Sequence, residues 1–299
     1  MKSKDPRLLG NTIKAFGFLA PFLILYTVFI IWPVIQGIYV SFHRWGLMGK
    51  IRFVGLNNYR RFFTEKYFWE ALWHSTWFVI LAVPSVIIAA VVLALLANRN
   101  SKLKKLFRVC FYLPCVLSVS VISFMARYLF SPYTGFISTL LHTLNVVTDT
   151  MEIPWLLSIP HIWFVVTTIT VWWTTGFSMM LYISAMQDIP DTVYEAAEID
   201  GASKTRQLFK LTLPLLKPTT YLILLLQIIA SFKIFGQIYL ISRGGPGTAT
   251  RPLIQLIYET AFRDNDLGYA SAMSYALFFI LVILSLLQIK YQNYRDGAS

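Results

Sequence analysis

Six apolar runs, each long enough to cross a lipid bilayer as a helix, constrain this chain more than any other feature of its sequence. A helix needs about 20 apolar residues to span the hydrocarbon core of a membrane. Only helices and closed barrels satisfy the backbone hydrogen bonds inside lipid. The runs therefore predict an all-α integral membrane protein with six transmembrane helices, at Ala15–Val40, Thr76–Ala97, Val109–Phe130, His161–Ala185, Thr219–Ile241 and Ala270–Ile289.

The composition agrees with a membrane protein and excludes an ordinary soluble enzyme. Hydrophobic residues make up 57% of the 299 residues and charged residues only 13%, whereas about 25% of the residues in soluble domains are charged. A net charge of +12 would suggest nucleic acid for a soluble protein. Basic residues also gather in the cytoplasmic loops of membrane proteins, so we expect a lipid membrane and no nucleic acid as partner.

The distribution of Lys and Arg predicts the orientation of the helices. Basic residues are more frequent at the N-terminus and in every second loop, and the short loop Asn98–Arg108 has five basic and no acidic residues. Such loops face the cytoplasm, so both termini are predicted to be cytoplasmic. The expected divisions are a cytoplasmic N-terminus (1–14), a first span with an external loop (15–75), a five-span core containing a cytoplasmic loop (76–289, loop 186–218) and a cytoplasmic C-terminus (290–299).

One external loop is predicted to contain a short helix. Residues 133–147 carry apolar side chains at helical spacing, at Phe136, Leu140, Leu141 and Leu144. This pattern is typical of a helix that lies in the membrane interface. A cysteine at Ser138 is therefore expected to react with an impermeant reagent from outside, and one at Ser101 to be shielded.

The loop between the fourth and fifth spans has the signals of two helices separated by a glycine. Asp191 follows Pro190 and would be a good N-cap, and Gly201 suits a left-handed helix stop. Ser203 could then cap a second helix that ends at Pro214. The first helix has a narrow face of small residues and few bulky apolar side chains to bury in lipid. A helix that docks onto another protein is therefore favoured over a hairpin lying on the membrane.

The same loop resembles a motif of ABC importer permeases. Its pattern Glu195-Ala196-Ala197-x3-Gly201-x9-Leu211-x-Leu213-Pro214 is similar to E-A-A-x3-G-x9-I-x-L-P, with Leu211 in place of the usual isoleucine. Other stretches resemble the carbohydrate-uptake branch, in particular the maltose- and glycerol-phosphate-type subunit that is the first of two sister permeases. These stretches are 53–59, 176–182, 238–246, 249–250 and 268–272.

The resemblance implies the permease subunit of an ATP-driven importer for a sugar or oligosaccharide, working by alternating access. The implied partners are a different sister permease in a heterodimer, two ATPase subunits that bind ATP and Mg, and an extracytoplasmic substrate-binding protein. The chain itself would bind no cofactor and would not be an enzyme. The implied location is the inner membrane of a prokaryote, with a multi-pass chain. The residues implied to form the ATPase-coupling loop are Glu195, Ala196, Ala197, Glu198, Asp200, Gly201, Leu211, Leu213 and Pro214.

The fifth span is unusually polar and is our candidate for the substrate pathway. Polar residues in a span face the protein interior or a water-filled path, or they hydrogen-bond a neighbouring helix, and the sequence leaves both interpretations open. Relatives usually carry an acidic residue where this chain has Gly236, which removes a possible partner for Lys233. The candidate pathway residues are Gln227, Ser231, Lys233, Phe235 and Gln237.

Three other functions are weighed against sugar import. The same machinery could import a polyol or a glycerol-phosphate-type solute. An ion-coupled secondary carrier is disfavoured because all 14 acidic residues lie outside the six apolar runs, whereas such carriers place carboxylates in the membrane. A membrane enzyme is disfavoured because the sequence has no metal-ligand pattern, no phosphate-binding loop and no nucleophile with a nearby base.

Overall fold

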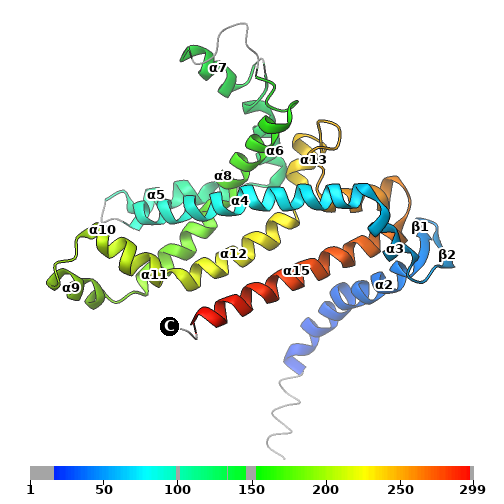
Figure 1. The fold of residues 1–299 in the computed structure, drawn as a ribbon, viewed down its shortest axis with the longest axis horizontal. Coiled ribbons are helices and arrows are strands. Elements are labelled where there is room, and N and C mark those ends of the chain that lie inside the picture. Colours follow the sequence, from blue (N-terminus) through cyan, green and yellow to red (C-terminus); the bar gives the residue numbers. More distant parts are fainter. Residues whose placement is uncertain (1–16, 99–101, 133, 146–152, 297–299) are drawn as a thin grey trace, which may run out of the picture. The chain divides into compact units, whose positions relative to one another are not determined.

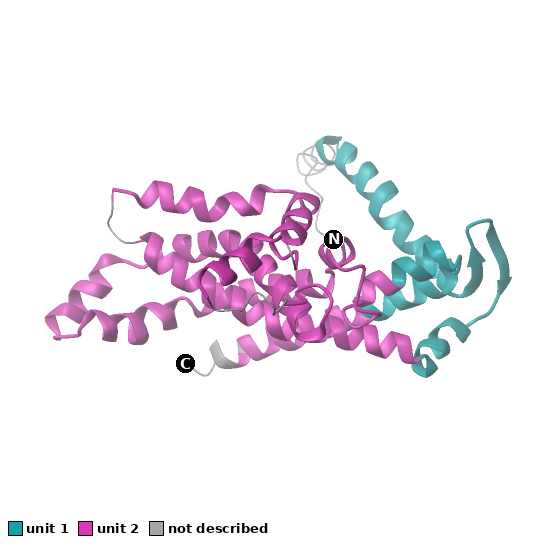
Figure 2. Ribbon diagram, turned by 90° about the horizontal axis from the view of Figure 1, so that it is seen from above, with its two compact units in different colours: residues 1–65, 257–277 teal, residues 66–256, 278–299 magenta. Residues whose placement is uncertain are grey.

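The computed structural model describes residues 17–98, 102–132, 134–145 and 153–296. This part of the chain is mostly helical and divides into two compact units (Figures 1 and 2). One unit comprises residues 1–65 and 257–277, and the other comprises residues 66–256 and 278–299. The predicted N-terminal segment 1–14 and Ser101 lie outside the described residues.

Four helices are long and apolar enough to cross a membrane, and they correspond to the predicted first, second, fourth and sixth spans. Their bounds are Gly17–Ser41, Lys66–Asn98, Ile159–Gln187 and Leu267–Gln292. Two further candidates are bent pairs of helices, so the described residues hold four spans, or six if each bent pair is one span. Each predicted run is thus largely helical, although the third and fifth runs are interrupted.

The first unit combines the N-terminal helix with a small hairpin and a short helix. The helix contains a π-helical turn, η1 (Thr27–Ile31), and ends as α2 (Trp32–Ser41). Strands β1 (His43–Gly46) and β2 (Gly49–Phe53) pair antiparallel, and α3 (Asn57–Thr64) follows. The later segment of this unit contains the π-helical turn η4 (Glu259–Arg263) and the start of α15 (Leu267–Asp296).

Polar side chains tie the pieces of the first unit together. The buried Asn58 amide donates to the carbonyl oxygens of Ser41 at 2.8 Å and His43 at 3.0 Å, which joins α3 to the end of α2 and to β1. Arg61 forms ion pairs with Glu65 and Asp266, each at 2.6 Å. The Arg61–Asp266 pair links two segments that are 205 residues apart in the sequence.

The second unit is built around α4 (Lys66–Asn98) and α8 (Ile159–Gln187), which pack along one another. Small residues of α4 are fully buried in this interface, where they allow the two backbones to approach closely, as is common between membrane helices. Ala90 and Ala94 face Met179 and Tyr182 of α8 in one apolar cluster. The remaining helices of this unit are α5 (Lys104–Tyr112), η2 (Leu113–Val116), α6 (Val119–Leu129), α7 (Phe136–Thr143), α9 (Asp191–Ile199), α10 (Lys204–Gln207), η3 (Leu208–Thr212), α11 (Leu213–Leu215), α12 (Lys217–Phe232), α13 (Gly236–Ile241) and α14 (Leu253–Tyr258), the last of which reaches into the first unit.

The prediction of one continuous helix over Val109–Phe130 is wrong. A first segment, Lys104–Val116, and a second, Val119–Leu129, meet at an angle of 98°. Leu117 and Ser118 are extended, and the Ser118 hydroxyl caps the second segment by accepting the backbone N–H of Val121. Pro114 lies in the 3-10 turn just before the break. Proline restricts the preceding backbone and removes a donor, so the sequence did contain a signal for this interruption.

The prediction of one continuous helix over Thr219–Ile241 is also wrong. Helix α12 ends at Phe232, and a second helix, α13, begins only at Gly236. Between them, Phe235 leaves helical geometry with φ −142° and ψ −65°. The chain also bends by 58° before α12, between Lys204–Leu215 and Lys217–Phe232.

The predicted helix in the external loop is present as α7 (Phe136–Thr143). Ser138, however, is only 5% exposed, and its hydroxyl accepts a hydrogen bond from the Trp155 indole at 3.2 Å. It also donates to the carbonyl oxygen of Ser131. Ser138 is therefore a poor labelling position, and the expectation that a cysteine there reacts readily is corrected.

Gly176 allows the bent third segment to pack against α8. A Cβ atom at this position would clash with the carbonyl oxygen of Phe111 and would lie 2.9 Å from the Cα atom of Tyr112. We expect Gly176→Val to cost about 1–3 kcal/mol, the usual cost of overpacking. The yield and the Tm of the purified protein should fall together. The neighbouring Phe177→Ala is the matched control, because Phe177 is 49% exposed; equal behaviour of the two variants would contradict the close approach.

Candidate functional site

The loop between α8 and α12 forms a helical hairpin with a glycine at its tip. Gly201 has φ +75°, which confirms the predicted left-handed conformation. The Ala202 N–H donates to the Ala197 carbonyl oxygen at 2.8 Å, and the Gly201 N–H donates to the Glu198 carbonyl oxygen at 3.0 Å. These two bonds form a Schellman motif, which satisfies the last carbonyl groups of α9.

The two helices of the hairpin are capped differently at their N-terminal ends. The Ser203 hydroxyl accepts the backbone N–H of Arg206, which confirms the predicted cap of the second helix. The predicted cap at Asp191 is wrong, because the capping position is Pro190 and no side chain caps this end. Asp191 is instead the first helical residue, where a carboxylate favours the positive end of the helix dipole.

The second helix of the hairpin continues past its predicted end at Pro214. It runs through α10, the π-helical turn η3 and α11 to Leu215. In η3 the Leu213 N–H donates to the carbonyl oxygen of Leu208, five residues earlier. Pro214 lacks an N–H, and its ring would clash with a carbonyl group in a normal α-turn. The wider turn accommodates this proline within the helix.

Side chains stabilise the hairpin at three places, and two of these join its arms. The Tyr194 hydroxyl lies 3.1 Å from the Thr212 hydroxyl, which joins α9 to η3. Lys204 pairs with Glu198 near the tip. Hydrogen bonding and charge attraction from Lys204 hold the pKa of the Glu198 carboxyl below its ordinary value. A third bond runs from the Gln207 amide to the Ala202 carbonyl oxygen at 3.3 Å.

The hairpin presents an exposed surface despite these internal bonds. No residue of α9 is buried. Ile199 is 87% exposed and Phe209 is 61% exposed. A cavity of about 210 Å³ lies on the hairpin, lined by Ala197, Asp200, Ala202, Arg206, Gln207, Lys210 and Leu211. Ile199 and Phe209 are therefore not covered by the described part of the chain.

All five predicted pathway residues line one cavity at the far end of α12. The cavity has a volume of about 210 Å³. Helix α12 is 16 residues long, which is about 24 Å at 1.5 Å per residue; the hairpin precedes its first turn, and the cavity lies along its last turns. Figure 1 shows α11 and the hairpin at one end of α12 and α13 at the other. The residues around the cavity are Phe78, Val119, Thr170, Trp173, Thr174, Gln227, Ala230, Ser231, Lys233, Ile234, Phe235, Gly236 and Gln237.

The polar residues of this cavity are held by different elements. Gln227 lines the cavity and also donates to the Ser178 hydroxyl of α8 at 3.2 Å. Gln227 thus forms the hydrogen bond to a neighbouring helix that one interpretation predicts, and its place at the cavity is compatible with the other, which stays a prediction. Ser231 and Gln237 are each 5% exposed. Phe235 reaches the cavity from the break between α12 and α13, which interrupts the predicted fifth span.

Helix α8 supplies cavity residues that the sequence analysis did not select. Thr170 and Thr174 each donate to a carbonyl oxygen four residues earlier, at 2.7 Å and 2.8 Å. Their oxygen atoms can still accept hydrogen bonds. Trp173 is held by a hydrogen bond from its indole to the Leu117 carbonyl oxygen at 3.1 Å. Rigid aromatic faces beside hydrogen-bonding groups suit a ligand with both apolar faces and hydroxyl groups.

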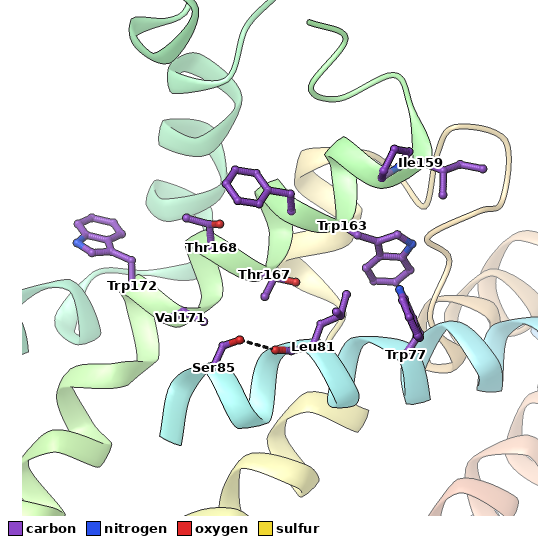
Figure 3. Close-up of a pocket in the computed structure, with 11 residues that line it drawn as sticks. Trp77, Leu81, Ser85, Ile159, Trp163, Thr167, Thr168, Val171 and Trp172 are labelled. Carbon is purple, nitrogen blue, oxygen red and sulfur yellow. Dashed lines mark hydrogen bonds between the residues drawn. The ribbon is translucent and has the colours of Figure 1, made fainter. Parts of the chain in front are cut away.

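A larger pocket of about 830 Å³ lies between α4 and α8 (Figure 3). Its walls are mostly apolar and aromatic, with Trp77, Trp163 and Trp172 among the lining residues. The Ser85 hydroxyl in this pocket donates to the Leu81 carbonyl oxygen of its own helix at 2.7 Å. Thr167 and Thr168 are the other hydroxyl-bearing residues of this pocket, and its wall is otherwise apolar and aromatic. The smaller cavity at the end of α12 is lined by more polar side chains, so it is the better candidate for a polar substrate.

Comparison with known families identifies the chain's relatives. A family profile described as "Binding-protein-dependent transport system inner membrane component" matches residues 86–292. The chain is 31% identical over 291 residues to the sulfoquinovosyl glycerol transport system permease protein SmoG of Agrobacterium fabrum, which covers 96% of this chain and 93% of that protein. It is also 31% identical over 285 residues to the multiple sugar-binding transport system permease protein MsmF of Streptococcus mutans. This match covers 95% of this chain and 97% of that protein.

A solved structure has the same fold. It is a chain in a bacterial alginate ABC transporter in complex with an alginate pentasaccharide-bound periplasmic protein, with a TM-score of 0.83. The match covers 94% of each chain at 19% sequence identity. The described helices, including the two bent pairs, therefore belong to an ABC transporter permease fold.

Proposed function

Because the chain belongs to the family of binding-protein-dependent transport system inner membrane components, we propose that it is the permease subunit of an ATP-driven importer for a sugar or oligosaccharide. The observation that carries the proposal is the cavity at the end of α12, which combines neutral hydrogen-bonding groups with the aromatic residues Phe78, Trp173 and Phe235. Sugars need both, because they have hydroxyl groups and apolar ring faces. The names of the relatives SmoG and MsmF agree with a carbohydrate substrate.

The hairpin is the proposed contact with an ATPase. We propose that two separate ATPase subunits bind ATP and Mg, and that one of them holds the exposed hairpin of this chain. The proposed contact residues are those of the sequence motif, Glu195, Ala196, Ala197, Glu198, Asp200, Gly201, Leu211, Leu213 and Pro214. Closure of the ATPase pair would move the hairpin, and α12 would transmit this movement to the cavity. Alternating access follows if the cavity opens to each side of the membrane in turn.

Two further partners complete the proposed importer. A sister permease pairs with this chain as a heterodimer, and a substrate-binding protein delivers the sugar from outside. The proposed location is the inner membrane of a prokaryote, with both termini in the cytoplasm and the divisions 1–14, 15–75, 76–289 and 290–299. A polyol or a glycerol-phosphate-type solute would use the same machinery and is the alternative substrate class.

The partners and the substrate class can be tested together. We expect the tagged chain, purified from its own host, to carry a second permease and an ATPase. The binding protein encoded beside it should bind a sugar or oligosaccharide in a thermal-shift screen that also contains polyols and glycerol phosphodiesters. A chain that purifies without an ATPase, or a binding protein stabilised only by a solute that is not a carbohydrate, would contradict the proposal.

The orientation predicts a pattern of cysteine labelling. In a background with Cys110→Ser and Cys115→Ser, a cysteine at Thr143 should react with an impermeant thiol reagent in whole cells, and one at Lys102 should react only after permeabilisation. Both positions are exposed. Serine suits position 115 because the Cys115 thiol donates to the Trp173 carbonyl oxygen at 2.8 Å. The reverse pattern would place the termini outside.

A further inference from the structure

We propose that the cavity at the end of α12 receives an anionic group of the carbohydrate, such as a carboxylate, sulfate or phosphate, and that Lys233 and Gln237 bind this group. The inference rests on the proposed function, because it assigns a substrate class to the same cavity. It follows from the charge of the cavity lining, from a buried amide without a partner, and from the division of hydrogen-bonding groups within the cavity.

Lys233 brings a positive charge that nothing in the described cavity neutralises. The residue ends α12, where its backbone N–H donates to the Ala230 carbonyl oxygen at 3.2 Å. Its side chain forms no ion pair with any described carboxylate. The cavity lining includes no Asp or Glu, and the next turn begins with Gly236, which has no side chain. Lys233 is exposed rather than buried. A charged residue that lines a cavity within a membrane-spanning region marks a substrate or ion pathway, so an anionic ligand in the cavity would pair with it.

Gln237 provides a second, independent observation. The side chain lines the same cavity and is only 5% exposed. Its Nε2 atom has no hydrogen-bond partner within the described part of the chain. A buried polar atom without a partner costs free energy and calls for an explanation, such as a ligand that is absent from the structure. The amide N–H groups are donors, as is the Lys233 ammonium, and donors are what the oxygens of an anion accept.

The remaining polar groups of the cavity are suited to hydroxyl groups rather than to a second charge. The hydroxyl oxygens of Thr170 and Thr174 can accept hydrogen bonds, since their protons are used within α8. The side-chain oxygen of Gln227 is a further acceptor, because its amide nitrogen donates to Ser178. The cavity thus has a donor side at Lys233 and Gln237 and an acceptor side on α8 and α12. An anionic sugar presents an anionic group and, at a distance from it, hydroxyl donors, whereas an inorganic anion is too small to reach both sides of the cavity.

The size of the cavity limits what it holds. Its volume of about 210 Å³ is below the roughly 300–1,000 Å³ of most small-molecule pockets. It therefore suits one sugar unit, with the rest of a longer substrate outside it. Phe78, Trp173 and Phe235 supply aromatic faces for that unit.

The test measures binding to the complete transporter, assembled from this chain, its sister permease and the ATPase subunits in nanodiscs without the binding protein. Isothermal titration compares digalacturonate with galactobiose, and glucose 6-phosphate and glucose 6-sulfate with glucose. Inorganic phosphate and sulfate are titrated as free anions. We expect at least one anionic sugar to bind about 10- to 100-fold more tightly than its uncharged parent, the range for hydrogen bonds to charged groups, and more tightly than the free anions.

Variants assign this preference to the two residues. Lys233→Gln should reduce the ratio of the affinity for the anionic sugar to the affinity for its uncharged parent to about one. Lys233→Arg should retain this ratio because the charge remains. Gln237→Leu should weaken binding of the anionic sugar more than binding of its parent. Lys290→Gln is the control for loss of one positive charge, since Lys290 is exposed on α15 outside the cavity.

Three outcomes would overturn the inference: no anionic sugar binding more tightly than its parent, equal binding of the free anions, or an unchanged ratio in Lys233→Gln. Uptake of labelled sugars with the cognate binding protein separates this failure from failure of the proposed function. ATP-driven uptake of uncharged sugars without a preference for anionic ones would overturn the inference and leave the proposed function standing. No ATP-driven uptake of any carbohydrate would overturn the proposed function.

Discussion

Gly201→Val is expected to reduce substrate uptake severely while membrane insertion of the chain persists. Gly201 has φ +75°, and a Cβ atom there would meet nothing within 4 Å. The cost of the substitution is therefore conformational rather than steric. A β-branched residue held in this backbone region costs roughly 1–3 kcal/mol. If this cost opposes the docking conformation, uptake should fall by about 5- to 150-fold. Uptake and the amount of ATPase that co-purifies are the measurements.

Gly201→Asn is the matched control for this prediction. Asparagine adopts the left-handed conformation more readily than other residues with a Cβ atom. It should keep most of the ATPase that co-purifies and most of the uptake. If valine and asparagine behave alike, the backbone conformation of the tip does not matter for docking. Normal uptake with Gly201→Val would remove the hairpin from the coupling mechanism.

Leucine at Gln227 or Ser231 is expected to reduce uptake per assembled transporter. Either change fills part of the cavity and removes a polar group that substrate would otherwise satisfy. A hydrogen-bonding group desolvated without its partner costs about 1–3 kcal/mol, so uptake per assembled complex should fall by about 5- to 150-fold. The measurements are initial uptake rate and the amount of complex recovered with both permeases and the ATPase.

Ser178→Ala separates the two roles of Gln227. Ser178 accepts the hydrogen bond from Gln227 but does not line the cavity. Its loss should weaken the contact between α8 and α12 by the smaller amount typical of polar contacts in membranes, about 0.6 kcal/mol. Uptake per complex should then stay close to the wild-type value. If Ser178→Ala and Gln227→Leu lower the uptake per assembled complex equally, Gln227 acts as a link between helices and does not line the pathway.

The predictable part of the fold is the part determined by local patterns. The apolar runs predicted the long helices. The signals at Gly201 and Ser203 predicted the two arms of the hairpin, because helix caps depend on a few neighbouring residues. The break at Leu117–Ser118 is not predicted by the apolar run, because the mean hydropathy is high on both sides of it and hydropathy carries no information about φ and ψ. Pro114 was the available signal. The break after Phe232 had no comparable proline before it.

The candidate cavity was predicted in part, for a similar reason. Polarity within an apolar run selected the α12–α13 residues, and the structure brings all five of them to one cavity. Their partners on α8 could not be found in the same way, because periodicity within one helix does not reveal which distant helix packs against it. Trp173 lies among several tryptophans in the sequence, and only the packing of α8 against Leu117 distinguishes it.

ATP-dependent uptake into proteoliposomes tests the central claim most directly. The liposomes would contain this chain, its sister permease and the ATPase subunits, with ATP on the ATPase side and the loaded binding protein on the other. The labelled sugar is the one identified for the binding protein. The account predicts accumulation that requires ATP, the binding protein and this chain together. Accumulation driven by a proton or sodium gradient without ATP, or unchanged accumulation when this chain is omitted, would contradict it.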